Sequence, residues 1–129
     1  MMLKRDSGSL IVANNLASLL ADHRTDNASL EQAHRLAMML RKSQVPFFKD
    51  TLGWVYYQRR DYKNALALLE EAAAALPGVP AVRYHLGMAY LADGQTEKGV
   101  EQFNTALGLA PDNLLHSKLR AAKDKAGAL

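Results

Sequence analysis

Residues 46–79, PFFKDTLGWVYYQRRDYKNALALLEEAAAALPGV, decide the fold, because residues 80–113, PAVRYHLGMAYLADGQTEKGVEQFNTALGLAPDN, repeat their pattern without a gap. Each matching pair is separated by 34 residues. The pairs are Leu52 and Leu86, Gly53 and Gly87, Tyr56 and Tyr90, Ala65 and Gly99, Leu69 and Phe103, Ala72 and Ala106, and Pro77 and Pro111. A period of this length predicts a stack of helical hairpins, each burying its apolar face against its neighbours.

The residue types at these positions have physical reasons. Small residues allow the two helices of a hairpin to cross closely, and large residues fill the space between layers. The small ones are Gly53, Ala65, Gly87 and Gly99, and the large ones are Tyr56, Leu69, Tyr90 and Phe103. Pro77 and Pro111 are predicted to end the second helices, because proline disfavours a helical conformation at the residue before it.

Together these positions resemble the tetratricopeptide repeat family, whose pattern is Leu-Gly, a Tyr three residues later, a small residue, a large residue, Ala and Pro. The resemblance implies an all-α fold, an α-solenoid of antiparallel helix hairpins wound into a right-handed superhelix. It also implies a scaffold that binds a partner peptide or protein in a concave groove. We therefore expect a protein that is not an enzyme.

A single domain is expected over residues 1–129. Its repeats are predicted at about 10–45, 46–79 and 80–113, with a capping helix at 114–126. In the first repeat, Leu16-Ala17 and Leu20 take the places of Leu52-Gly53 and Tyr56, and Ala33 takes the place of Ala65. A longer loop of turn-forming residues, 22–27, accounts for the changed spacing.

Helices are expected near 9–22, 28–42, 46–59, 62–76, 80–92 and 96–109. Ser29-Leu30-Glu31-Gln32 has the form of a capping box that opens the second helix. Asp61 and Thr96 are predicted N-caps, and Asp93-Gly94 a turn.

The two ends of the chain differ. In the last helix Leu115, Leu119 and Ala122 share one face, as in a terminal cap. The first helix is apolar over much of its circumference, and residues 3–8 resemble the end of an earlier repeat and its turn. We therefore expect a C-terminal fragment of a longer array. Self-association through the exposed first helix, or a structural role in such an array, is the alternative function.

Helical spacing nominates a groove on the first helix of each hairpin. The nominated residues are Asn14, Ser18, Phe47, Asp50, Thr51, Trp54, Tyr57, Gln58, Tyr84, His85, Met88 and Leu91, with Ile11 and Asn15 beside them. This set is aromatic and nearly neutral, and Trp54, Tyr57, Tyr84 and Met88 are the expected anchors of a bound peptide. The competing interpretation is that Trp54 and Tyr84 only pack between neighbouring first helices.

One well-known form of this groove is not expected. Family members that bind chaperones hold a C-terminal carboxylate with a clamp of Lys, Asn and Arg. The corresponding positions here are Asn14, Ser18, Thr51, Ala81 and His85. Because none of them is Lys or Arg, the charge-assisted grip on a carboxylate is missing.

No catalytic residues, metal site or cofactor are predicted. The chain has no cysteine. Its histidines, at 23, 34, 85 and 116, lack the spacing of metal ligands. The second alternative is nucleic-acid binding through Lys118, Arg120, Lys123 and Lys125, with Arg59, Arg60 and Lys63 elsewhere; such binding would weaken strongly with salt. A solubilising cap is the favoured explanation of these charges.

The sequence says little about location. It has no signal-peptide pattern and no apolar run of the ~18 residues that a membrane span needs. The compartment is therefore not assigned by the sequence, and the cytoplasm is only the default. However, the first two repeats also resemble the C-terminal repeats of large bacterial tetratricopeptide proteins, some linked to exopolysaccharide production and protein sorting. That resemblance would make a periplasmic or lipid-anchored parent protein possible.

Overall fold

The computed structural model describes residues 2–24, 26–109 and 114–128, with side chains from residue 8 onward except that of Leu114. These residues form helices and no strands. The helices are α1 (Met2–His23), α2 (Asn27–Met38), α3 (Pro46–Gln58), α4 (Tyr62–Ala75), α5 (Pro80–Ala92), α6 (Thr96–Leu109) and α7 (Leu114–Gly127). The fold is therefore the predicted all-α repeat architecture.

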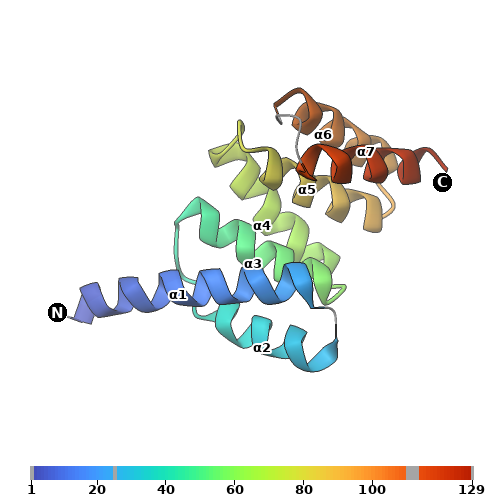
Figure 1. The fold of residues 1–129 in the computed structure, drawn as a ribbon. Coiled ribbons are helices and arrows are strands. Elements are labelled where there is room, and N and C mark those ends of the chain that lie inside the picture. Colours follow the sequence, from blue (N-terminus) through green and yellow to red (C-terminus); the bar gives the residue numbers. More distant parts are fainter. Residues whose placement is uncertain (1, 25, 110–113, 129) are drawn as a thin grey trace.

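The helices are arranged as three successive hairpins and a final helix (Figure 1). The hairpins are α1–α2, α3–α4 and α5–α6, and α7 packs on α5 and α6. The first helices also contact one another, α1 with α3, α3 with α5 and α5 with α7, whereas the described parts of α2, α4 and α6 make no such contacts. We call α1, α3, α5 and α7 the inner helices, because the closer spacing of this layer puts it on the inside of the stack.

The small residues of the repeat lie where the helices of a hairpin cross. A β-carbon added to Gly53 would lie 2.8 Å from Cγ of Leu69, and one added to Gly87 would lie 2.5 Å from the Phe103 ring. At Gly99 it would lie 2.9 Å from the Gly87 carbonyl oxygen. Leu69 and Phe103 are fully buried. The close-crossing explanation of the repeat pattern is confirmed.

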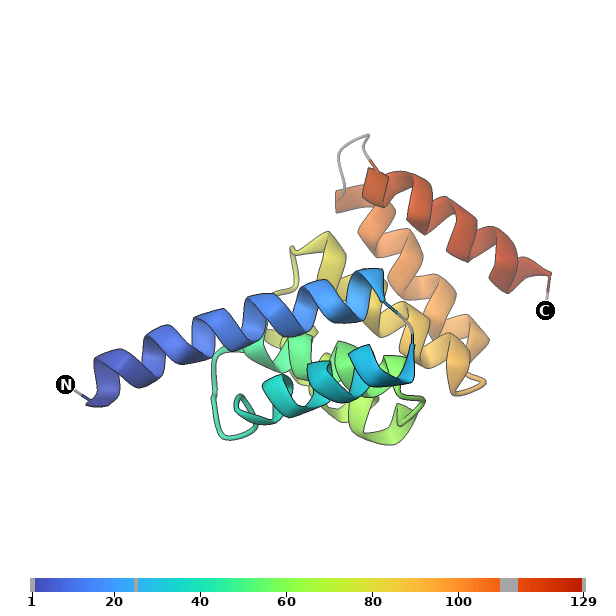
Figure 2. The ribbon, with the colours of Figure 1, turned by 60° about the horizontal axis from the view of Figure 1, so that its bottom comes forward.

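The boundaries of the second and third hairpins match the prediction to within one residue, but those of the first do not. The first helix begins at Met2 instead of residue 9. Residues 3–8 are thus helical and do not form a turn, because the segment has no proline and one glycine costs a helix only ~1 kcal/mol. Figures 1 and 2 both show α1 extending beyond its neighbours. The second helix ends at Met38, not at residue 42.

Two predicted caps also require correction. The side chain of Asp26 caps α2, since its Oδ2 accepts a hydrogen bond of 3.0 Å from the Ser29 backbone N–H. Ser29 itself is buried within the first turn, so it opens no capping box. Thr96 is the first residue of α6, and the cap position belongs to Gln95, whose carbonyl accepts from the Gly99 N–H.

The other predicted turn signals agree with the structure. Asp61 caps α4 by accepting from the Asn64 N–H at 3.4 Å. Gly94 has a φ of +84°, a conformation that glycine adopts readily, and it lies in the predicted turn. Arg60, at the same position of the preceding hairpin, has a φ of +66°. Pro77 follows the end of α4, whereas Pro111 lies outside the described residues.

Candidate protein-binding surface on the inner helices

All twelve predicted groove residues lie on three inner helices. Asn14 and Ser18 are on α1; Phe47, Asp50, Thr51, Trp54, Tyr57 and Gln58 are on α3; Tyr84, His85, Met88 and Leu91 are on α5. We call this set the inner surface. Its members differ widely in exposure, so they cannot all contact a partner in the same way.

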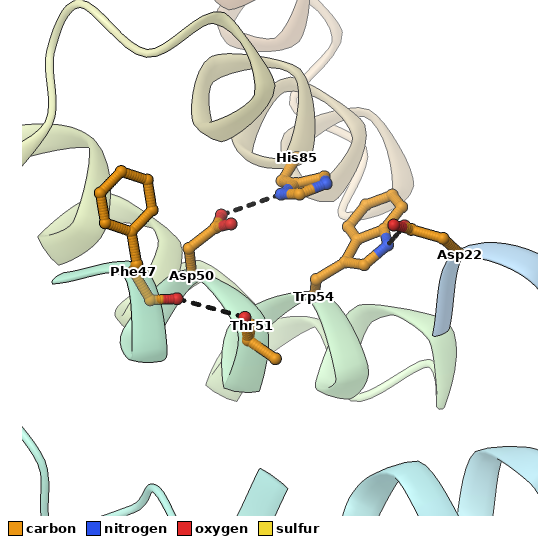
Figure 3. Close-up of polar contacts among 6 residues, drawn as sticks. All are labelled: Asp22, Phe47, Asp50, Thr51, Trp54 and His85. Carbon is orange, nitrogen blue, oxygen red and sulfur yellow. Dashed lines mark hydrogen bonds and ion pairs between the residues drawn. The ribbon is translucent and has the colours of Figure 1, made fainter. Parts of the chain in front are cut away.

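Trp54 is held at the centre of the inner surface. Its side chain is only 6% exposed. The ring stacks on Tyr57, with centroids 4.6 Å apart, and on His85, with centroids 4.1 Å apart. Its Nε1 donates a hydrogen bond of 2.9 Å to Oδ1 of Asp22 in the last turn of α1 (Figure 3). Trp54 therefore joins α1, α3 and α5, as the packing interpretation of this residue expected.

Asp22 is a contact of the site that the sequence reasoning missed. The sequence places residue 22 at the junction of the first helix and its loop, and α1 continues to His23. A signal was nevertheless present, since the N–H of a buried tryptophan usually finds a hydrogen-bond acceptor. An acidic residue near the end of the neighbouring first helix can supply that acceptor.

A second polar contact joins α3 to α5. Nδ1 of His85 lies 2.9 Å from Oδ1 of Asp50, and Asp50 is itself buried (Figure 3). The buried Thr51 hydroxyl donates to the Phe47 carbonyl at 3.2 Å. Both buried polar side chains on α3 are thus partnered, as their removal from water requires. Asp50 and Thr51 are therefore each held by a hydrogen bond within the inner surface.

The exposed residues of the inner surface lie around the buried Trp54, Asp50 and Thr51. Phe47 is 51% exposed, although it is aromatic. Tyr57, Gln58, Tyr84, His85 and Met88 are each partly exposed. Met88 and Tyr84 also pack against the cluster that includes Phe103 and Leu119, so the surface continues toward α7.

Tyr57 and Gln58 also line a pocket of about 530 Å³ at the end of α3. Its other lining residues are Asn27, Leu30, Glu31, Arg59, Arg60 and Tyr62. Burial raises the pKa of the Tyr57 hydroxyl, and burial together with the nearby Asp22 charge raises the pKa of the Tyr84 hydroxyl. Both hydroxyls are therefore protonated at neutral pH and can donate hydrogen bonds.

The predicted cap differs from the inner surface in character. Leu119 and Ala122 of α7 are buried, as predicted, while Lys118, Arg120, Lys123 and Lys125 are exposed. Asp124 lies among these basic residues. In the described parts of the chain no group of His, Asp or Glu side chains could hold a metal ion. No described helix is both long and apolar enough to span a membrane.

The sequence profile of the tetratricopeptide repeat matches residues 56–123. The chain belongs to the tetratricopeptide repeat family. Members of this family serve in general as scaffolds for protein interactions. No curated protein matches the sequence.

Solved structures of repeat proteins are similar to this domain. A mutant O-GlcNAc transferase from Thermobaculum terrenum is 27% identical with a TM-score of 0.74, and the match covers 92% of this chain but 22% of that one. A thermophilic repeat protein from Thermus thermophilus is 25% identical with a TM-score of 0.67, and the match covers 96% of this chain and 64% of that one. MamA from Desulfovibrio magneticus RS-1 shares the fold, at 24% identity and a TM-score of 0.66. The match covers 96% of this chain and 75% of that one.

Proposed function

We propose that this tetratricopeptide repeat domain binds a segment of a partner protein on its inner surface. The observation that supports the proposal best is that buried, hydrogen-bonded side chains lie beside an exposed aromatic side chain on the same helix. Trp54, Asp50 and Thr51 are buried and partnered, whereas Phe47 is half-exposed. A rigid support lowers the conformational entropy lost on binding, and exposed aromatic side chains are frequent binding hot spots.

The dimensions suit a short segment. Phe47 and Gln58 lie near opposite ends of α3, about 16 Å apart at 1.5 Å of rise per residue. An extended peptide of about five residues covers such a length. The exposed ring of Phe47 would contact an apolar side chain at one end, and the pocket beside Gln58 would receive a polar side chain at the other.

Peptides selected from a random display library, followed by calorimetric titration, would test this proposal. Phe47→Ala should weaken the best peptide about tenfold or more, as loss of an aromatic hot-spot residue usually does. The matched control is Leu109→Ala, because Leu109 is 43% exposed on α6, outside the inner surface. It should leave the affinity unchanged within about twofold.

Selected peptides whose affinity is equally insensitive to Phe47→Ala and Gln58→Ala would contradict the proposal. A salt titration adds an independent check. Docking on aromatic side chains should persist at high salt, whereas phosphate binding by the basic residues of α7 should weaken steeply.

A further inference from the structure

The pocket at the end of α3 is lined mainly by hydrogen-bond donors. Its charged lining residues are Arg59, Arg60 and Glu31, so cations outnumber anions. The remaining polar lining side chains are tyrosine, asparagine and glutamine, and each of these can donate a hydrogen bond. The volume of about 530 Å³ is within the ~300–1,000 Å³ of typical ligand pockets. The chemistry of the lining therefore favours an anionic group.

The two guanidinium groups in the lining are not neutralised by other side chains. Among the described residues, neither Arg59 nor Arg60 forms a side-chain hydrogen bond or an ion pair, and Glu31 pairs with neither. The adjacent Asp61 is engaged elsewhere, since its Oδ2 accepts a hydrogen bond of 2.8 Å from the Asn64 side-chain amide. Both arginines are thus available to a carboxylate of a ligand, which a guanidinium group can hold through two parallel hydrogen bonds.

Arg60 occupies a backbone position that suits glycine. Helix α3 ends in a Schellman motif, in which the Asp61 N–H donates to the Tyr56 carbonyl at 2.9 Å. Arg60, the residue at the turn of this motif, has a φ of +66°, whereas the same turn after α5 contains Gly94 with a φ of +84°. A side chain at positive φ costs folding free energy that glycine avoids. A function of the Arg60 side chain in the pocket explains why this position is not glycine.

Aromatic packing fixes the side of the pocket that adjoins the inner surface. The Tyr57 ring stacks on the buried Trp54, with centroids 4.6 Å apart, and its centroid lies 5.8 Å from that of Tyr62. Tyr57 and Gln58 belong both to the inner surface and to the pocket lining. A segment bound along α3 can therefore place a side chain in the pocket.

We propose that the pocket binds an acidic side chain, Asp or Glu, of the partner segment, with Arg59 and Arg60 as its cationic contacts. This inference rests on the proposed function, because that function places one end of the bound segment at Gln58. Phe47 contacts an apolar side chain at the other end, so the segment combines an apolar and an acidic residue about five positions apart. The site differs from the carboxylate clamp of chaperone-binding relatives, because its cations come from the turn between α3 and α4.

Calorimetric titration of the full chain with two peptides tests the inference. The probes are the tightest binder from the display library and its counterpart in which Asn and Gln replace every Asp and Glu. Arg60→Gly should weaken the acidic peptide about fivefold, because it removes a charge-assisted contact, and Arg59→Gln should act in the same direction. The thermal midpoint of Arg60→Gly should equal or exceed that of wild type, because glycine adopts a positive φ without strain. High salt should narrow the difference between the two peptides without abolishing binding.

Two further variants separate a specific contact from general electrostatics. Glu31→Gln removes the anion of the lining, so it should tighten the acidic peptide about twofold or more and leave the neutral peptide unchanged. Lys63→Gln is the matched control, because Lys63 is exposed in the first turn of α4 and lies outside the pocket lining. It removes one positive charge, as Arg60→Gly does, but it should change the affinity by less than about twofold.

Two results would overturn the inference and leave the proposed function intact. The selected peptides could lack Asp and Glu, or bind as tightly in their neutral form, while remaining sensitive to Phe47→Ala. Alternatively, Arg60→Gly and Lys63→Gln could weaken the acidic peptide by the same factor, which would reduce the effect to net charge. Peptides that are insensitive to both Phe47→Ala and Gln58→Ala would instead contradict the proposed function itself.

Discussion

Leu16 in the first hairpin and Leu86 in the third are the same residue at the same position of the repeat, yet they are 45% and 3% exposed. The difference arises from their neighbours, since α4 packs on α5 and no described helix packs on the corresponding side of α1. The comparison teaches that the repeat pattern specifies which side of a helix is suited to packing. Burial of that side depends on a neighbouring hairpin.

The interiors of the two hairpins also differ. The first hairpin crosses through alanines, with Ala17, Ala33 and Ala37 fully buried, and residues 1–45 contain no Phe, Trp or Tyr. The third hairpin crosses at Gly87 and Gly99 and encloses Phe103. The first hairpin therefore has fewer bulky interior contacts of its own, and Leu52, Trp54 and Val55 of α3 complete its core.

The largest loss of stability is expected from substitution of Trp54, which connects the first hairpin to the second. Trp54→Ala should lower the free energy of unfolding by about 3–5 kcal/mol, as removal of a buried tryptophan usually does. Phe47→Ala, which removes an exposed ring from the same helix, should cost less than about 1 kcal/mol. Urea unfolding followed by circular dichroism would measure both. Equal losses for the two variants would show that Trp54 does not connect the hairpins.

Matched leucine variants test the burial difference directly. Leu86→Ala should destabilise the fold by about 2–5 kcal/mol, because it leaves a cavity between α4 and α5. Leu16→Ala should cost less than about 1 kcal/mol, because this side chain is 45% exposed and its truncation leaves no enclosed cavity. A loss at Leu16 that is as large as the loss at Leu86 would contradict the exposure difference between the two leucines.

Alanine substitution of a glycine at the crossing of α5 and α6 tests how tightly the interior of the third hairpin is packed. Gly87→Ala should destabilise the third hairpin by about 1–3 kcal/mol, because the added β-carbon would lie 2.5 Å from the buried Phe103 ring. Gly8→Ala is the control, since a β-carbon there meets nothing within 4 Å. This control should be neutral or slightly stabilising, because alanine favours a helix by up to ~1 kcal/mol over glycine. Thermal unfolding of both variants would measure this difference in stability.

The smallest effect concerns Tyr90, whose counterpart in the first hairpin is Leu20. Burial, and then its hydrogen bond to the Glu70 carboxylate, raise the pKa of Tyr90 to about 12. The unfolded chain loses this proton near pH 10, so stability should be present below pH 10 and fall as the pH rises toward 12. Tyr90→Phe should have a flatter dependence of the urea midpoint between pH 9 and pH 11. Equal slopes for wild type and variant would contradict the assignment.

The second and third hairpins were predictable from sequence because their signals are local. Gly53, Gly87 and Gly99 are small where the crossing requires it, and Asp61 caps α4 as its residue type suggests. The first hairpin was less predictable. Asp26 and Ser29 are both acceptable N-caps, and residues 3–8 could be helix or turn by composition alone.

For the candidate site, the sequence determined which residues lie on the inner helices, because helical periodicity assigns them to one side of α3 and α5. The tertiary structure decided what each residue does there. It buries Trp54 and Asp50 and pairs them with Asp22 and His85, which are more than 30 residues away along the chain. It also leaves Phe47 and Leu16 in solvent. The physical reason is that periodicity reports the direction of a side chain, whereas burial and hydrogen bonding depend on residues that only folding brings near.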